Sequence, residues 1–399
     1  MDLLFISYWS ADEPLTHSTI LPYFRLMARM GRVRRIVFVT VEWGGRTAPM
    51  EMDGLANVEH RPFVPWRLGW GPASRLGIFL RLAFGLAAVA RREGIGLIDS
   101  KGAVAGGIAH WVSRLSGVPY MVESFEPHSD YMADCGIWHR TGLYYRAAGW
   151  MEGLQRRHAR HLITVTHNYR TWLVDKGVPA ERVKVIPSIT DLDAFAFNPE
   201  ERRSLRLELG WEDRAIGVYL GKFGGLYYDR EAYALFGQAW RHWQGELRLL
   251  LATNEPEARV RAQLAEEGIP HDHAVVRFLP HHAVPAWLSA SDFAFSTIRY
   301  TPHGLYQSPV KNGEYWANGL PVLLTHGISD DHHLIQEDPR LGALFDLDLP
   351  GSTGKALEHM AHLVRQGPCR QEIMQVAREH RGMHLAEGVY REIFGTDRP

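Results

Sequence analysis

A helix that carries a lysine and a glutamate three residues apart has the clearest chemistry in this sequence. Residues 308–323 read SPVKNGEYWANGLPVL. Ser308 is a good N-cap and Pro309 suits the first helical position, so we expect a helix to begin here. Free N–H groups at that end attract phosphate, Lys311 adds a positive charge, and Glu314 can accept hydrogen bonds from sugar hydroxyls. The pattern predicts a site for a nucleotide sugar, and an N-capped helix with a solvated glutamate is the alternative.

A second candidate for anion binding follows a predicted strand in the middle of the chain. Residues 216–220 read as a buried strand, and the turn GKFGG comes directly after it. Glycines let a backbone approach an anion closely, and a lysine can bind a diphosphate as a point charge. The turn matches neither a Walker loop nor a dinucleotide fingerprint, so a plain tight turn is the alternative. The residues expected at the diphosphate are Gly221, Lys222, Gly224 and Gly225.

These segments resemble the donor-binding region of the retaining GT-B glycosyltransferases of the family 4-like group, also called glycosyl transferases group 1. In that family a glutamate on a helix before a G-[LIV]-P-V turn binds the ribose of the nucleotide, and here Glu314 precedes GLPV. The pattern SPxKxxEY is similar to a sub-branch of polysaccharide-assembly enzymes. The family's other glutamate, eight positions earlier, is replaced by Tyr306. The resemblance implies ribose binding by Glu314, a diphosphate contact by Lys222, and diphosphate binding by the turn Ser308, Pro309, Val310 and Lys311.

The resemblance also implies where the base and the rest of the donor lie. Backbone groups around Phe278 and Leu279 would meet the base, and the turn at 327–331 would lie near the diphosphate. We expect the two aspartates of that turn to be solvated. Neither of the adjacent histidine pairs, 281–282 and 332–333, has the spacing of a zinc site, so no metal is predicted.

The best candidate for chemistry in the N-terminal half is the loop VESFEPHSDYM, residues 122–132. Glu126 and His128 could orient an acceptor hydroxyl or the donor sugar. Relatives in the sub-branch are similar at PHxDYM, whereas the family's usual Phe-His pair falls on residues 125–126. Which of the two side chains has the role stays open, and a loop stabilised by local hydrogen bonds is the alternative. In the loop between the first strand and the first helix, the resemblance implies a contact to a phosphate or to the acceptor. The candidates there are Thr16, His17 and Ser18.

The order of elements predicts an α/β protein. Short apolar strands alternate with helical stretches in both halves, which is typical of parallel sheets covered on both faces. The resemblance implies the GT-B fold, two Rossmann-like domains with parallel sheets facing a central cleft. We place an acceptor-binding domain at 1–190, a nucleotide-sugar-binding domain at 191–375 and a C-terminal helix that crosses back at 376–399. The strands are expected at 3–7, 36–41, 97–98, 120–122, 161–165 and 183–187, then at 215–220, 247–252, 274–278, 293–296 and 321–324.

Composition and charge narrow the function further. The chain has 399 residues and two cysteines, which provide no disulfide framework, so a reducing cytoplasm is expected. The N-terminus reads as a strand and not as a signal peptide. Residues 1–190 hold 23 Lys and Arg against 16 Asp and Glu, and the rest holds 21 against 29. The basic helices predicted at 74–92 and 138–161 cannot span a bilayer, but they could lie on an anionic membrane surface; packing on their own sheet is the alternative.

The resemblance implies transfer of a sugar from a UDP- or GDP-linked donor to an acceptor hydroxyl, with retention at the anomeric carbon. It implies a front-face route in which the leaving phosphate takes the acceptor proton, with no cofactor and no divalent metal. The expected acceptor is a glycan or a polyprenyl-linked glycan at the inner membrane face, and no nucleic-acid partner is expected. Three alternatives stay open: a UDP-sugar 2-epimerase, a non-catalytic protein that binds sugar nucleotides or glycans, and, ranked last, a nicotinamide enzyme.

Overall fold

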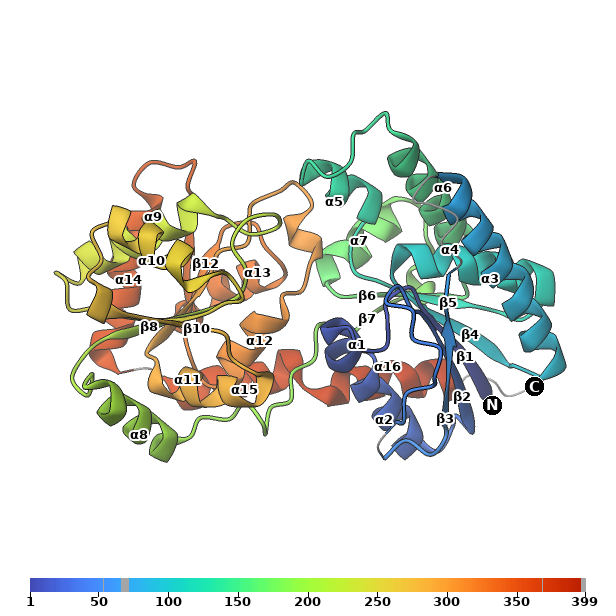
Figure 1. The fold of residues 1–399 in the computed structure, drawn as a ribbon, viewed down its shortest axis with the longest axis horizontal. Coiled ribbons are helices and arrows are strands. Elements are labelled where there is room, and N and C mark those ends of the chain that lie inside the picture. The colour runs from blue at the N-terminus through green and yellow to red at the C-terminus, as the bar shows by residue number, and fades with distance from the viewer. Residues whose placement is uncertain (53, 66–71, 368, 396–399) are drawn as a thin grey trace. The chain divides into compact units, whose positions relative to one another are not determined.

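The computed structural model describes residues 1–52, 54–65, 72–367 and 369–395, which form two compact units (Figure 1). Unit 1 comprises residues 1–187 together with those from 384 onward, and unit 2 comprises Ser188–Met383. Each unit is built on one parallel sheet with helices against its faces. The predicted α/β organisation is therefore confirmed within each unit.

The sheet of unit 1 has seven strands among the described residues, in the order β3-β2-β1-β4-β5-β6-β7. Every residue of β1 and all but the first residue of β2 are buried, as expected for parallel strands covered on both faces. Strand β3 was not predicted, because its sequence VEHRPF mixes charged residues into a partly exposed edge strand. The strands are β1 (Asp2–Ser7), β2 (Arg35–Val41), β3 (Val58–Phe63), β4 (Leu97–Lys101), β5 (Met121–Ser124), β6 (His161–Thr164) and β7 (Val183–Val185).

Helix α4 packs between α3 and α6 in unit 1, and α16 lies beside α2, where the rings of Tyr23 and Tyr390 are 5.9 Å apart (Figure 1). The helix predicted at 138–161 is shorter than expected, because Gly142 is the N-cap of α6 and β6 begins at His161. The helices are α1 (Pro14–Thr19), α2 (Leu21–Met30), α3 (Pro72–Arg92), α4 (Gly102–Ser116), α5 (His128–Asp134), α6 (Leu143–His158), α7 (His167–Asp175) and α16 (Met383–Gly395).

The sheet of unit 2 has six strands in the described part, in the order β10-β9-β8-β11-β12-β13. Strand β13 was not predicted from its short sequence GALF. It begins at Gly342, where φ is +143° and a Cβ would lie 1.9 Å from the carbonyl oxygen of Val322, so only glycine fits. The strands are β8 (Ile216–Leu220), β9 (Arg248–Ala252), β10 (Ala274–Arg277), β11 (Phe293–Ser296), β12 (Val322–Thr325) and β13 (Gly342–Phe345).

Two apolar clusters enclose this second sheet. One is built around Trp316 and the other around Phe236, and both side chains are fully buried. The single helical stretch expected near the C-terminus is two helices, separated at Gly382. The helices of unit 2 are α8 (Pro199–Leu209), α9 (Arg230–His242), α10 (Glu257–Glu266), α11 (Val284–Ala290), α12 (Val310–Ala317), α13 (Asp331–Glu337), α14 (Ser352–Gln366) and α15 (Arg370–Arg381).

Within the described ranges, every helix is too short or too polar to cross a lipid bilayer.

Candidate functional site

The N-terminus of α12 is open to a ligand. The helix begins at Val310 with Pro309 as its N-cap, and no described side chain caps it. The prediction that Ser308 is the cap is wrong: its Oγ accepts hydrogen bonds from the backbone N–H of Ser188 at 3.0 Å and from Nη1 of Arg381 at 2.9 Å. Pro309 itself has no N–H, so the first-turn N–H groups that follow it are available to an anion.

Lys311 lies against the end of β8. A Cβ on Gly221 would be 2.3 Å from the Nζ of Lys311, and Gly221 has φ of +148°. The same Nζ lies 4.4 Å from the centre of the Tyr227 ring and 3.4 Å from its hydroxyl. Gly221 therefore leaves the space that lets the lysine reach the carboxyl end of the strand, next to the α12 N-terminus.

The turn that follows β8 is anchored by Phe223 and exposes Lys222. Phe223 is buried and stacks on Tyr219 and Tyr233 at ring distances of 4.8 and 4.4 Å. The hydroxyl of Tyr219 also donates to the carbonyl oxygen of Lys222 at 2.5 Å. Gly224 and Gly225 have φ of +81° and +65°, which glycine adopts without strain. The backbone is thus held in place while the ammonium group of Lys222 faces solvent.

Glu314 is buried and bonded, so the alternative of a solvated glutamate is wrong. Its Oε1 is 3.3 Å from Nε2 of His281, a residue 33 positions earlier whose side chain is largely exposed. The hydrogen bond to Glu314 raises the pKa of His281, with smaller contributions from the charges of Glu314 and Asp191. The ring of Phe195 supports His281 at a centroid distance of 5.3 Å. Sequence reasoning considered His281 only as a metal ligand and missed this contact.

The other residues predicted at the donor lie on loops of unit 2. Phe278 directly follows β10 and its side chain is 72% exposed, so its ring is available for stacking, whereas Leu279 packs partly against the core. Tyr306, which replaces the family's first glutamate, ends a short 3-10 helix at Gly304–Tyr306 and is half-buried.

A buried ion pair joins the helices around this site. The predicted solvation of Asp331 is wrong, because Asp331 begins α13 and its side chain is closed to solvent against Arg381 at the end of α15. Burial raises the pKa of Asp331, and the charge of Arg381 opposes that rise. Asp331 also accepts a hydrogen bond from Nδ2 of Asn312 on α12 at 2.8 Å. Since Arg381 also binds Ser308, the pair fixes the start of α12 to both α13 and α15.

In unit 1, Glu126 and His128 contact each other. Oε1 of Glu126 is 2.9 Å from Nδ1 of His128, the first residue of α5. Burial lowers the pKa of His128, but the hydrogen bond and charge of Glu126 outweigh it, with help from Glu152, and the pKa is raised. Glu152 of α6 holds the start of α5 by accepting hydrogen bonds from the N–H and Oγ of Ser129 at 2.9 and 2.7 Å. The two candidates thus form one acid–base pair on a braced loop.

The first strand–helix loop places its three candidates differently. Thr16 is buried and its hydroxyl donates to the carbonyl oxygen of Ser10 at 2.9 Å, so it supports the loop. His17 is exposed and Ser18 is half-buried.

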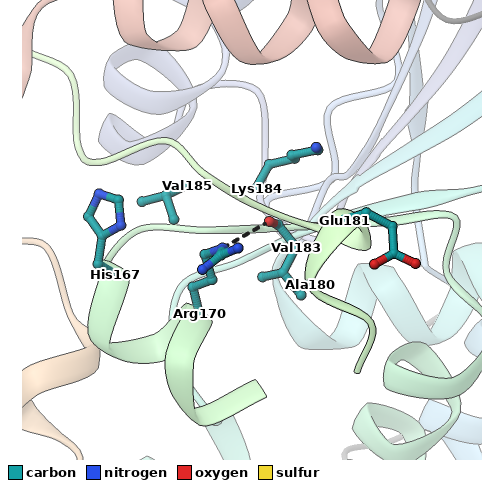
Figure 2. Close-up of a pocket in the computed structure, with 7 residues that line it drawn as sticks. All are labelled: His167, Arg170, Ala180, Glu181, Val183, Lys184 and Val185. Carbon is teal, nitrogen blue, oxygen red and sulfur yellow. Dashed lines mark hydrogen bonds between the residues drawn. The ribbon is translucent and has the colours of Figure 1, made fainter. Parts of the chain in front are cut away.

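A pocket of about 430 Å³ lies beside the edge strand β7 of unit 1 (Figure 2). It is lined by His167 and Arg170 of α7 and by Lys184 of β7, among others. Nε of Arg170 donates to the carbonyl oxygen of Val183 at 3.3 Å, and Lys184 pairs with Glu392. Because Arg170 and Lys184 are both engaged within the protein, we assign no ligand to this pocket.

No group of three or more His, Cys, Asp and Glu side chains in the described part of the chain could hold a metal ion.

The structure as a whole has the GT-B fold. It is similar to HepE from Anabaena, which has been solved in complex with UDP and with UDP-glucose. The comparison with the UDP complex gives a TM-score of 0.72 and 14% sequence identity, and it covers 99% of this chain and 100% of HepE. It is also similar to sucrose-phosphate synthase from Thermosynechococcus elongatus, with a TM-score of 0.75, 14% identity and 100% of both chains covered. A Listeria monocytogenes protein assigned as a UDP-N-acetylglucosamine 2-epimerase shares the fold with a TM-score of 0.62, 14% identity, and 100% of this chain and 98% of that one covered.

At the level of sequence, residues 18–188 match the model of the glycosyl transferase 4-like domain. The matched range lies mainly in unit 1 and includes the Glu126–His128 loop. The comparison with curated proteins gave no match. The structural similarity establishes the fold, and the domain match covers a range that lies mainly in unit 1.

Proposed function

We propose that the protein transfers a sugar from a UDP- or GDP-linked donor to an acceptor hydroxyl, with retention of the anomeric configuration. The observation that carries the proposal is the arrangement in unit 2 around the open end of α12, where Lys311 lies against Gly221 and a buried glutamate stands one turn further along the helix. A nucleoside diphosphate needs both features, because its phosphates require cations and N–H donors and its ribose requires a hydrogen-bond acceptor. Similarity to HepE, which has been solved with UDP and with UDP-glucose, supports this choice of donor class.

The residues of unit 2 divide the work between binding and charge stabilisation. Lys222, Lys311 and the first-turn N–H groups of α12 stabilise the negative charge that develops on the leaving diphosphate. Glu314 holds the ribose hydroxyls, for which His281 must give up its hydrogen bond. The donor is thereby fixed with its diphosphate on the helix end, and the charge that forms in the transition state meets groups that are already oriented.

The Glu126–His128 pair of unit 1 is assigned to the acceptor hydroxyl or the donor sugar. The hydrogen bond between the two side chains orients the imidazole, and Glu126 raises the pKa of His128, so the imidazole can donate a hydrogen bond to a sugar hydroxyl without taking part in the proton transfer. We propose a front-face route, in which the departing phosphate oxygen takes the proton of the attacking hydroxyl on the same face of the sugar. Charge stabilisation by side chains and N–H groups makes the proposed reaction independent of a divalent metal.

Turnover of a nucleotide sugar tests this function. UDP-glucose, UDP-N-acetylglucosamine and GDP-mannose are incubated with the protein and an oligosaccharide acceptor, with and without Mg²⁺, and the product anomer is read by proton NMR. Glu126→Gln and His128→Gln should lower kcat while nucleotide binding to unit 2 is kept. Release of free sugar without any acceptor would favour the 2-epimerase, and stable nucleotide binding without turnover would favour a non-catalytic protein.

We also propose that unit 1 docks on an anionic membrane surface, where a polyprenyl-linked glycan would serve as acceptor. Helix α3 packs Ile78 and Leu82 inward but leaves Leu76, Leu80 and Phe84 at 59%, 45% and 61% exposure. These three residues are spaced by four and so share one face of the helix. Exposed arginines flank them at positions 75, 81, 91 and 92. An apolar row beside cations suits an interfacial helix on anionic lipid.

Sedimentation with phosphatidylglycerol vesicles at low salt tests this docking. Leu80→Asp with Phe84→Asp should abolish binding, whereas Leu207→Asp, an equally exposed apolar position on α8 of unit 2, should leave it intact. If the α3 variant and the control bind vesicles alike, the assignment of this face is wrong.

A further inference from the structure

An open pocket of about 670 Å³ in unit 1 has no role in the site described above. It lies at the carboxyl ends of β1 and β2, where two loops meet, and ligands of parallel α/β sheets bind at that edge. The side chains that line it are Ser10, Asp12, Glu13, Glu42, Trp43 and Arg46.

Trp43 provides this pocket with a flat apolar surface. Its side chain is partly exposed, yet Nε1 donates to the carbonyl oxygen of Tyr8 at 3.3 Å and the indole packs edge-on against the Tyr8 ring at 5.3 Å. A held aromatic ring loses little entropy when a ligand covers it. The C–H face of a pyranose ring is a ligand surface of matching size and polarity.

Glu42 provides the pocket with a carboxylate that has one oxygen free of hydrogen bonds from the described residues. The residue is only 2% exposed, although it lines the pocket. Both hydrogen bonds that it accepts, from the N–H of Ala11 at 2.9 Å and from Oγ1 of Thr40, end on Oε1. Within the described part of the chain, Oε2 accepts none. A sugar hydroxyl that enters the pocket can donate a hydrogen bond to this oxygen, and a bond to a charged acceptor is a strong one.

The charges of the pocket determine which sugars it can accept. Three carboxylates line it, at positions 12, 13 and 42, against the single guanidinium of Arg46, which is already paired with Asp12. A uronic acid or a phosphorylated sugar would be repelled, whereas an uncharged polyol would not. This pocket is acidic although unit 1 as a whole is basic, so it does not simply follow the charge of its unit.

We propose that this pocket binds an uncharged pyranose residue, with the ring on Trp43 and a hydroxyl donated to Glu42. Its identification as the acceptor subsite rests on the proposed glycosyl transfer; sugar binding itself does not. If the pocket is the acceptor subsite, the acceptor is a neutral glycan, and the sugar residue that receives the new linkage carries no charge.

Saturation-transfer NMR on the full chain tests the pocket without any donor. The probes are the methyl glycosides of glucose, galactose, mannose and N-acetylglucosamine, together with methyl glucuronide, which differs from the glucoside by its C6 carboxylate. We expect at least one neutral glycoside to bind and methyl glucuronide not to bind. Trp43→Ala should weaken that binding about tenfold or more, and Trp43→Phe should restore part of it.

Two further variants separate the pocket from general effects on the fold. Glu42→Gln, which exchanges an oxygen for a donor at constant shape, should also weaken the neutral glycoside. Trp150→Ala, which removes an exposed indole from α6 of the same unit, should not. The proposal is overturned if no neutral glycoside binds, if the glucuronide binds equally well, or if Trp43→Ala leaves binding unchanged. UDP binding measured on the same sample reports on unit 2, so the two proposals fail separately.

Discussion

Removing the guanidinium of Arg381 should destabilise unit 2 by about 3–5 kcal/mol. The side chains of Arg381 and Asp331 are only 4% and 1% exposed, so Arg381→Met leaves a carboxylate buried without its charge partner. It also removes the hydrogen bond to Oγ of Ser308. Arg340 and Asp338 provide the matched control, because they form an ion pair in the same unit with side chains 53% and 24% exposed. Arg340→Met should cost less than about 1 kcal/mol.

Urea unfolding followed by tryptophan fluorescence measures both costs. Trp316, one of the 13 tryptophans of the chain, lies under the guanidinium of Arg381 at 5.8 Å, so this region contributes to the signal. Adding Asp331→Asn to Arg381→Met should recover part of the loss, because it removes the unpaired charge. Two results would show that the ion pair does not hold α12 as described. One is an equal loss of unfolding free energy in Arg381→Met and Arg340→Met; the other is a further loss of stability when Asp331→Asn is added to Arg381→Met.

Further predictions concern the binding of UDP, measured by calorimetry. Lys311→Met should weaken binding about tenfold or more and reduce its dependence on salt, whereas Lys355→Met on α14 should not change the affinity. Gly221→Ala should weaken binding too, because its Cβ would displace the ammonium group of Lys311; unchanged affinity would show that the lysine does not bind the diphosphate from this position. The raised pKa of His281 means that its bond to Glu314 is fully present below about pH 6.5, its ordinary pKa, and is lost as the pH rises through the raised value. UDP should therefore bind more tightly at pH 8 than at pH 6. In His281→Gln, only the smaller change in affinity that comes from ionisation of the phosphate itself should remain. If the wild type and His281→Gln show the same pH dependence of UDP affinity, displacement of His281 is contradicted.

The fold was largely predictable because apolar strands alternate with amphipathic helices in both halves. The strands that were missed are those whose sequences lack this contrast. Strand β3 alternates charged and apolar residues at an edge of the sheet, and β13 is four residues long. Its start at Gly342 depends on the close approach of the neighbouring strand, which local sequence does not show.

The site was predictable to the extent that its residues are close in sequence. Lys311 and Glu314 lie on one short helix, and the glycine turn directly follows a strand, so their placement follows from local rules. The partners of these residues could not be inferred in the same way. His281 is 33 positions from Glu314, and Arg381 is 50 positions from Asp331. Only tertiary packing against Arg381 turns the Asp331 carboxylate inward, and two adjacent aspartates in a turn give no local sign of that packing.

The central claim is that Glu314 and the α12 N-terminus bind a nucleoside diphosphate. Calorimetric titration of UDP and of GDP, with and without Mg²⁺, into the wild type, Glu314→Ala and the exposed control Glu337→Ala tests it most directly. We expect one of the two nucleotides to bind without metal, with an affinity that Glu314→Ala lowers about 100-fold and Glu337→Ala leaves unchanged. Failure of both nucleotides to bind, or equal affinity in the wild type and Glu314→Ala, would contradict the account.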